Sequence, residues 1–220
     1  MPSAPTVAIF DLDRTVTRAG TYTPFLLHCA PRSPLTVVRI LTGVVLALAY
    51  VAGFSSRGAF KARMLALFIA GASRAQVGLW ADTFTARCRL RPGALKAIAR
   101  HRAAGHTLVL ATASFDFYAA VFAARLGFDH VIATAGVWDE SGHLRAALGG
   151  ENCYGPAKVK AVKTFLEALP ARPRSVFYSD HHSDFELLRW ADEGMAVNPN
   201  AKLLRLAQTH GLAVVDWNSI

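Results

Sequence analysis

Short apolar segments that end in acidic or hydroxyl-bearing residues constrain the fold of this chain more than any other feature. Three of them are TVAIFD (6–11), HTLVLATAS (106–114) and SVFYSD (175–180). Each has the length and apolar content of a buried strand. Segments with helical periodicity, such as 157–169 and 201–211, lie between the strands. Strands that alternate with helices predict an α/β fold with a doubly wound, mostly parallel, Rossmann-like sheet.

The segment 17–90 interrupts this alternation, and its pattern is entirely helical. Residues 16–91 contain ten basic side chains and one acidic side chain, so this part of the chain accounts for the whole net charge of +9. We therefore predict a core domain formed by residues 1–16 and 91–220, with an inserted all-helical cap domain, residues 17–90. A basic and apolar cap suggests an anionic partner, either a membrane surface, a phosphorylated substrate or nucleic acid.

The cap contains a long apolar stretch, because residues 40–56 carry no charge over 17 positions. This length is at the lower limit of a membrane span. A single span would place Asp11 and Asp180 on opposite sides of the membrane, so we favour a helical lid that lies on the membrane surface. The alternative is an apolar helix packed inside the cap.

The N-terminal sequence and the cysteines indicate the compartment. The N-terminus has no basic region before its short apolar run, so it does not resemble a signal peptide. The three cysteines, Cys29, Cys88 and Cys153, have no metal-binding spacing and suit a reducing environment. We expect a cytoplasmic protein that associates peripherally with the inner membrane if the lid interpretation holds.

Polar side chains follow the predicted strands at the edge where ligands bind in open α/β sheets. They are Asp11 and Asp13, Thr112 and Ser114, and Asp180 and Asp184. Lys158 opens the helix that precedes the last of these strands. Such a set suits phosphoryl transfer, because carboxylates hold Mg²⁺, a lysine offsets phosphate charge, and one carboxylate can attack phosphorus.

Four segments carry a resemblance to a known family: DLDRT (11–15), LVLATAS (108–114), YGPAKVKAV (154–162) and VFYSDHHSDFELL (176–188). In order and spacing they resemble the four motifs of the haloacid dehalogenase (HAD) superfamily. The position of the insert is similar to the C1-type cap of subfamily IB, the phosphoserine-phosphatase-like branch. Within that branch, TYTPFLLHCA (21–30) and the apolar cap resemble the phosphatidylglycerophosphatase C type.

The resemblance implies roles for the acids. Asp11 is then the nucleophile, and Asp13 is the general acid that later acts as a general base. Mg²⁺ is then bound by Asp11, by the backbone carbonyl of Asp13 and by Asp180, with Asp184 as a ligand directly or through water.

The resemblance also implies a phosphate-binding set. Thr112 and Lys158 are expected to contact the phosphoryl group, and we add Ser114 and Arg14 as substrate-binding candidates. Arg14 replaces the glycine of the family motif, so the backbone at this position must suit a side chain.

Two further departures concern the substrate and the metal loop. TASF (112–115) replaces SGGF of the phosphoserine branch, which argues against free phosphoserine as the substrate. SDHHSD replaces GDGxND and adds His181 and His182, which we expect to be exposed loop residues.

The expected function is a Mg²⁺-dependent phosphomonoester hydrolase of the HAD type with an aspartyl-phosphate intermediate. An anionic lipid phosphate such as phosphatidylglycerol phosphate is the favoured substrate. The alternatives are a small soluble phosphomonoester, namely an amino-acid or amino-alcohol phosphate, and a phosphomutase of the same superfamily. A nucleic-acid-binding protein is disfavoured, because the basic segment matches no known binding motif.

Overall fold

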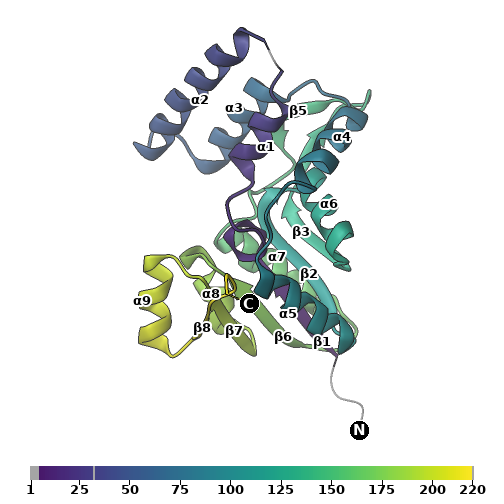
Figure 1. Cartoon of the computed structure of the whole chain (residues 1–220), viewed down its shortest axis with the longest axis vertical. Helices are drawn as coiled ribbons and strands as arrows, with labels where there is room; N and C mark the ends of the chain where they lie inside the picture. The colour runs from purple at the N-terminus through teal and green to yellow at the C-terminus, as the bar shows by residue number, and fades with distance from the viewer. Residues whose placement is uncertain (1–4, 32, 220) are drawn as a thin grey trace.

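The predicted α/β sheet is present and consists of six parallel strands (Figure 1). The computed structural model describes residues 5–31 and 33–219, so residues 1–4 and 220 of the predicted core and residue 32 of the predicted cap lie outside the described residues. In sheet order the strands are β3 (His130–Thr134), β2 (Thr107–Phe115), β1 (Thr6–Phe10), β6 (Arg174–Ser179), β7 (Glu193–Val197) and β8 (Ala213–Val215).

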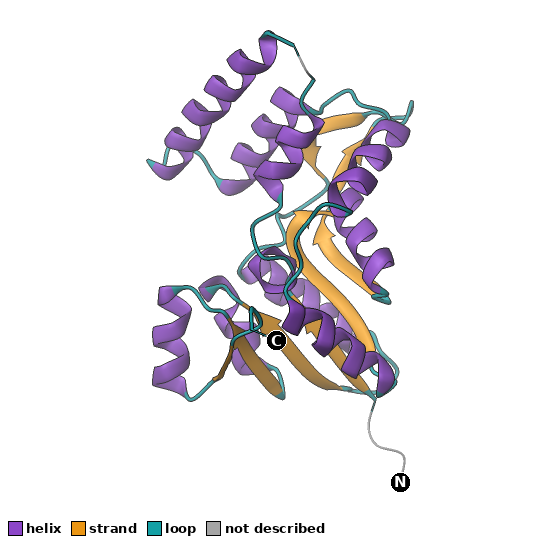
Figure 2. Cartoon of the chain, in the orientation of Figure 1, coloured by secondary structure: helices purple, strands orange, loops and turns teal. Residues whose placement is uncertain are grey.

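Helices cover both faces of this sheet (Figure 2). The helices are α5 (Pro92–Ala103) and α6 (Asp116–Leu126) on one face, and α7 (Pro156–Glu167), α8 (Phe185–Trp190) and α9 (Ala201–His210) on the other. Successive side chains of a strand point to opposite faces. In β1, Ala8 and Phe10 accordingly pack with α5 and α6, while Val7 and Ile9 pack with α7, α8 and α9.

Four helices lie in the sequence between β1 and α5, and we call them the cap helices. They are α1 (Tyr22–Cys29), α2 (Leu35–Val51), α3 (Arg57–Phe68) and α4 (Arg74–Thr85). Serine side chains begin two of them, because Ser56 accepts from the amide of Ala59 and Ser73 forms a capping box with Gln76. The exact division into core and cap domains stays a prediction.

A hairpin from the second half of the chain packs against the cap helices. It consists of β4 (Gly136–Trp138) and β5 (Leu144–Leu148), and its turn is formed by residues 139–143. Leu144 exchanges backbone hydrogen bonds with Gly71 and Ala72, at 2.8 and 2.9 Å. The hairpin therefore continues the surface on which α3 and α4 rest.

Helix α2 lies at the outside of the cap helices, where it packs on α3 (Figure 1). Gly43 is its one buried residue, and a Cβ at that position would be 3.5 Å from the side chains of Met64 and Phe68. Most large apolar side chains of α2 face solvent, with exposed fractions of 62% for Leu41 and 64% for Leu48, while Leu46 packs against the core. The interpretation of an apolar helix packed inside the cap is therefore wrong.

The length of α2 also bears on the membrane question. Among the described residues, no helix combines the length and the apolar character that a membrane span requires.

Candidate active site

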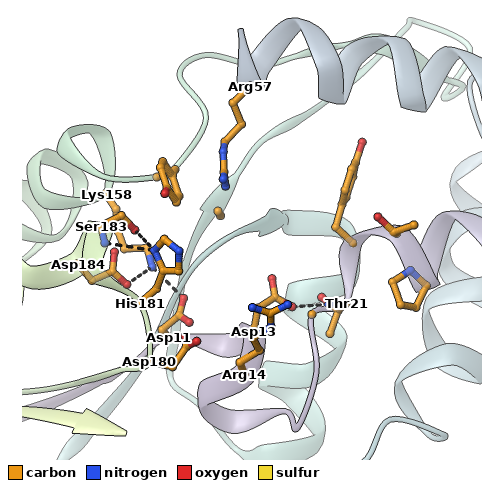
Figure 3. A pocket seen from close by; sticks show the side chains of 16 residues that line it. Asp11, Asp13, Arg14, Thr21, Arg57, Lys158, Asp180, His181, Ser183 and Asp184 are labelled. Atoms are coloured by element: carbon orange, nitrogen blue, oxygen red, sulfur yellow. Dashed lines mark hydrogen bonds and ion pairs between the residues drawn. The ribbon is translucent and has the colours of Figure 1, made fainter. Parts of the chain in front are cut away.

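The carboxyl ends of β1 and β6 bring together acids that are far apart in the sequence. Phe10 pairs with Tyr178 in the register of these strands, and the amide of Asp11 donates to the carbonyl oxygen of Tyr178 at 2.9 Å. Asp11 and Asp180 therefore leave neighbouring strands at the same edge. A pocket of about 410 Å³ opens there, and residues of the sheet edge and of the cap helices line it (Figure 3).

Lys158, in the first turn of α7, forms two buried ion pairs in this pocket. Its Nζ lies 2.8 Å from Oδ1 of Asp11 and 2.7 Å from Oδ2 of Asp184. The hydroxyl of Ser179 donates to the same oxygen of Asp184 at 2.7 Å. The other oxygen, Oδ1 of Asp184, is buried and has no hydrogen-bond partner among the described residues. A buried acceptor is thus left for a further ligand.

Thr15 lies between the carboxylates of Asp11 and Asp180. Its hydroxyl lies 3.2 Å from Oδ2 of Asp11 and 3.3 Å from Oδ1 of Asp180. The same hydroxyl accepts from the amide of Asp180 at 3.0 Å. One hydroxyl has one hydrogen to donate, so it serves one carboxylate at a time. The threonine of DLDRT therefore holds the two carboxylates in place without neutralising either.

Burial and mutual repulsion perturb these acids. Burial raises the pKa of Asp11 to about 8, against the opposing charge of Lys158 and with a further rise from Asp184 and Asp180. Burial also raises the pKa of Asp180 to about 6, again with a contribution from Asp184. Burial alone would lower the pKa of Lys158, but the charges of Asp11 and Asp184 raise it above its ordinary value. One lysine therefore faces more carboxylates than its charge can offset.

The donor set suits a hard cation. Within residues 5–31 and 33–219, no three His, Cys, Asp or Glu side chains form a complete metal site by themselves. Mg²⁺ binds through one or two carboxylates and keeps several waters, so it does not require such a cage. The unpartnered oxygen of Asp184 lies among the buried carboxylates of Asp11 and Asp180, so an acceptor suited to such a cation is available there. The residues present therefore fit Mg²⁺.

Asp13 lines the same pocket and is fixed by two donors. The amide of Thr21 donates to Oδ1 of Asp13 at 2.5 Å, and the hydroxyl of Ser114 donates to Oδ2 at 2.8 Å. The hydroxyls of Thr21 and Ser114 also contact each other at 3.2 Å. This arrangement holds a half-buried carboxylate at the wall of the pocket, where it can transfer a proton.

Arg14 adopts the conformation that the family motif gives to glycine. Its φ is 61°, which lies in the left-handed region. Its amide donates to the hydroxyl of Thr17, and its carbonyl oxygen accepts from Nε of Arg91 at 2.8 Å. The side chain is exposed at the border of the pocket, so the structure allows a substrate contact there.

Thr112 and Ser114 lie behind the pocket wall rather than on it. Both are buried, and the hydroxyl of Thr112 accepts from the amide of Ser114 at 3.0 Å. Neither lines the pocket that contains Asp11 and Lys158. The structure thus brings Ser114 to Asp13, and it buries Thr112 behind the residues that line the pocket.

Arg57 of α3 also lines the pocket, although its sequence position did not mark it as a site residue. Its guanidinium lies 3.7 Å from the ring centre of Tyr154, and its Nε donates to the hydroxyl of Tyr50 at 3.2 Å. Both Arg57 and Tyr154 line the pocket. Figure 3 shows the side chain of Arg57 directed toward it. The cap helices therefore supply a cation to the site.

Lys61, one turn further along α3, is buried between the cap helices and the sheet. Its Nζ donates to the carbonyl oxygen of Ala113 at 2.6 Å and to Oδ1 of Asn152 at 2.8 Å. Burial lowers its pKa to about 7, against the opposing charge of Asp13. The spacing of Arg57 and Lys61 places both on one helix face, but it does not indicate whether that face is buried.

A second, smaller cavity of about 190 Å³ lies beside the pocket and shares Asp13 with it. Its other lining residues are Tyr22, Tyr50, Arg57, Phe60, Lys61, Ala113, Ser114 and Asn152. Asp13 is the one acidic residue among them. The cavity is therefore aromatic and basic.

The loop histidines differ from the expectation of exposed residues. His181 and His182 are both half-buried, and His181 lines the pocket. The cause is the tight turn after β6, where the amide of Asp184 donates to the carbonyl oxygen of His181 at 3.1 Å. After this turn the ring of His181 lies with its centre 4.2 Å from that of His182, at an interplanar angle of 36°.

Comparison with known proteins agrees with this geometry. Residues 8–189 match the family model of haloacid dehalogenase-like hydrolases. Protein CicA of Caulobacter vibrioides is 33% identical over 197 residues, which cover 88% of this chain and 86% of that protein.

Solved structures share the fold. A protein of unknown function from Bordetella pertussis Tohama I has a TM-score of 0.86 at 26% identity, over 98% of this chain and all of that one. A phosphoserine phosphatase, solved as a phospho-aspartyl intermediate analogue, has a TM-score of 0.67 at 15% identity, over 99% of this chain and 95% of that one. The family match over most of the chain confirms the predicted superfamily and the prediction of an enzyme. The chain belongs to the haloacid dehalogenase-like hydrolases.

Proposed function

We propose that this chain is a Mg²⁺-dependent phosphomonoester hydrolase that works through an aspartyl-phosphate on Asp11. The observation that carries the proposal is the buried cluster in which Lys158 bridges Asp11 and Asp184 inside an open pocket. A carboxylate attacks a phosphate ester only when positive charge offsets the repulsion between the two anions. Lys158 supplies part of that charge at hydrogen-bond distance from the attacking group.

The reaction follows from the positions of two carboxylates. Asp11 attacks phosphorus, the bond from phosphorus to the leaving oxygen breaks, and Asp13 donates its proton to that oxygen. Water then attacks the aspartyl-phosphate while the carboxylate of Asp13 accepts a proton from it. The bond from phosphorus to Asp11 breaks, which restores Asp11 and releases inorganic phosphate. Thr21 and Ser114 keep Asp13 within reach of both oxygens.

Other residues position the phosphoryl group. Lys158 contacts its oxygens, and Arg14 approaches them from the exposed border of the pocket. The hydroxyl of Thr112 accepts from Ser114 and keeps its own hydrogen, which is available to a phosphoryl oxygen if the substrate reaches that depth. Ser114 acts through Asp13 in this scheme rather than on the substrate.

Mg²⁺ would be held by Asp11, Asp180 and the backbone carbonyl of Asp13, with Asp184 as a ligand directly or through water. When bound, it supplies positive charge to the transferring phosphoryl group. The support for this site is the buried, unpartnered oxygen of Asp184 next to acids of raised pKa.

The decisive experiment combines phosphate release with trapping of the intermediate. The purified chain is assayed with a panel of phosphomonoesters, and the reaction is quenched with borohydride, which reduces an aspartyl-phosphate. We expect release of inorganic phosphate and reduction at Asp11, and neither in the Asp11→Asn variant. Activity of that variant within about tenfold of the wild type would refute the proposal, because loss of a covalent nucleophile costs orders of magnitude. Transfer of phosphate to a second hydroxyl without release would instead indicate a phosphomutase.

The substrate we favour is an anionic lipid phosphate such as phosphatidylglycerol phosphate, met at the cytoplasmic face of the membrane. The exposed apolar face of α2 supports this choice, because such a face inserts into a lipid interface. Tyr50 belongs to α2 and also lines the small cavity, so the apolar helix borders the place where a leaving group would lie.

The chemistry of the small cavity bears on the soluble alternatives. Arg57 and Lys61 suit a leaving group that carries negative charge. An ammonium group would find Asp13 as its one acidic partner among the described lining residues. The cavity therefore favours an anionic lipid phosphate over an amino-acid or amino-alcohol phosphate. A hydrolysis screen with and without lipid vesicles distinguishes these substrates.

A further inference from the structure

We infer that His181 contacts the substrate and helps to select it, through the N–H group at Nε2 of its imidazole. The inference rests on the proposed phosphomonoesterase activity and adds a residue to the recognition of its substrate. His181 occurs where the family motif has glycine, so this loop carries a side chain that the motif lacks.

Hydrogen bonds to Ser183 determine which ring nitrogen carries the hydrogen. The amide of Ser183 donates to Nδ1 of His181 at 3.2 Å, and the hydroxyl of Ser183 lies 2.9 Å from the same nitrogen. A backbone amide can only donate, so Nδ1 presents its lone pair and the hydrogen is on Nε2. Among the residues that the structure describes, Nε2 has no hydrogen-bond partner.

Ring packing fixes the direction of this donor. The centre of the His181 ring lies 4.2 Å from that of His182 and 5.8 Å from that of Tyr154, and both contacts are tilted. Tyr154 is itself held under the guanidinium of Arg57 at 3.7 Å. A donor on a packed ring loses little conformational freedom when a ligand binds, so it contributes more to affinity than a mobile one.

The location of the ring identifies its acceptor. His181 lines the pocket that also contains Asp11 and Lys158 (Figure 3). A molecule bound there offers the oxygens of its phosphate ester. Lys158 and Arg57 attract such a molecule by charge, which has little directional preference. A neutral N–H donor requires an oxygen at one position and therefore discriminates between esters.

Two amide variants separate the donor from the rest of the side chain. His181→Asn keeps an acceptor near the position of Nδ1 for Ser183 but places no donor at the position of Nε2. His181→Gln is longer and places its amide N–H near that position. His182→Asn is the matched control, because His182 does not line the pocket. Each protein is assayed with p-nitrophenyl phosphate and with phosphatidylglycerol phosphate in mixed micelles.

We expect His181→Asn to lower kcat/KM by about ten- to a hundredfold, the range for a lost hydrogen bond to a charged acceptor. His181→Gln should recover most of the loss, and His182→Asn should match the wild type. A loss that is equal for both esters places the acceptor on the phosphoryl group. A loss confined to one ester places it on the leaving group.

Three results would overturn the inference while the proposed function stands. They are unchanged kcat/KM in His181→Asn, an equal loss in His181→Gln, and a loss that disappears when Mg²⁺ is raised, which would indicate an effect on the metal site. Melting temperatures identify any variant that fails to fold. If His181→Asn does not fold, kcat/KM of His181→Gln relative to the wild type decides whether the inference stands. Hydrolysis of neither ester by the wild type would overturn the proposed function and this inference together.

Discussion

The hydroxyl of Ser114 donates to Oδ2 of Asp13 at 2.8 Å, so the end of β2 positions a carboxylate that follows β1. Because Asp13 is the proposed general acid and base, Ser114→Ala should lower kcat by about tenfold without abolishing activity. Ser114→Thr keeps the hydroxyl and serves as the control. Steady-state kinetics check both variants, and equal rates for Ser114→Ala and the wild type would contradict the positioning role.

Mg²⁺ should restore activity that EDTA removes, and Ca²⁺ should restore it poorly, because Ca²⁺ prefers a larger and looser ligand shell. Phosphate release in dialysed protein with each added ion is the measurement. Full activity in the presence of chelator would rule out the proposed metal dependence.

The effect of Mg²⁺ on stability should depend on pH. The pKa of Asp11 is raised to about 8 and that of Asp180 to about 6 in the metal-free fold, whereas both are near 4 in the unfolded chain. The folded state therefore binds more protons across this range, and its stability falls as pH rises from about 4 to 8. Mg²⁺ competes with these protons, so the rise in melting temperature that it causes should be larger at pH 8 than at pH 6. Asp180→Asn should reduce that difference, and an equal rise at both pH values would contradict this prediction.

The contribution of Lys61 to the free energy of unfolding should rise with pH, opposite to that of Asp11 and Asp180. Its pKa is lowered to about 7 in the fold from 10.5, so the unfolded chain binds more protons between these values. The free energy of unfolding should therefore rise with pH across this window for the wild type relative to Lys61→Met. Urea unfolding of both proteins at pH 7 and pH 9.5 measures the difference. A constant difference would show that the amine is not desolvated in the folded protein.

Vesicle binding should depend on the apolar face of α2. We expect co-sedimentation with phosphatidylglycerol vesicles at low salt, little with phosphatidylcholine, and weaker binding as salt screens the basic residues. Replacement of Leu41, Val45 and Leu48 by Gln should abolish binding and leave the fold intact, because these side chains are exposed. Arg57 and Lys61 are unsuitable as probes of membrane contact, since both are engaged at the site.

The control for vesicle binding is Arg63→Glu on α3, an exposed residue that tests charge separately from insertion. If the wild type stays in the supernatant with both lipids, the surface interpretation fails. Soluble phosphomonoesters then become the first candidates for the substrate.

The acids of the site could be predicted because parallel strands fix where their ends meet. Asp11 and Asp180 follow strands that the apolar pattern identifies, and the sheet places those ends together in any fold of this class. The contact of Lys158 with Asp11 follows from the same logic, since Lys158 lies in the first turn of α7, the helix that precedes β6 and starts at the same edge of the sheet.

The roles of Arg57 and Lys61 could not be predicted, because charge alone does not say which face of a helix is buried. In the sequence they belong to a basic segment, which suggests exposed side chains that face an anionic partner. In the folded protein both side chains are engaged at the site. Arg57 lies over the ring of Tyr154, and Lys61 donates to the carbonyl oxygen of Ala113. The position of α2 was open for the related reason that an apolar helix is equally consistent with burial and with exposure.

The chain enters and leaves the cap helices through two segments that lie side by side. Thr17 pairs with Leu90 in an antiparallel bridge, the amide of Arg18 donates to the carbonyl oxygen of Arg89, and that of Arg91 donates to the carbonyl oxygen of Val16. The stem begins directly after the turn that carries Asp13, and the amide of Thr21, just beyond the stem, donates to Oδ1 of Asp13. The proposed proton-transferring carboxylate is therefore held at the junction between the sheet and the cap helices, by one donor from each side of it.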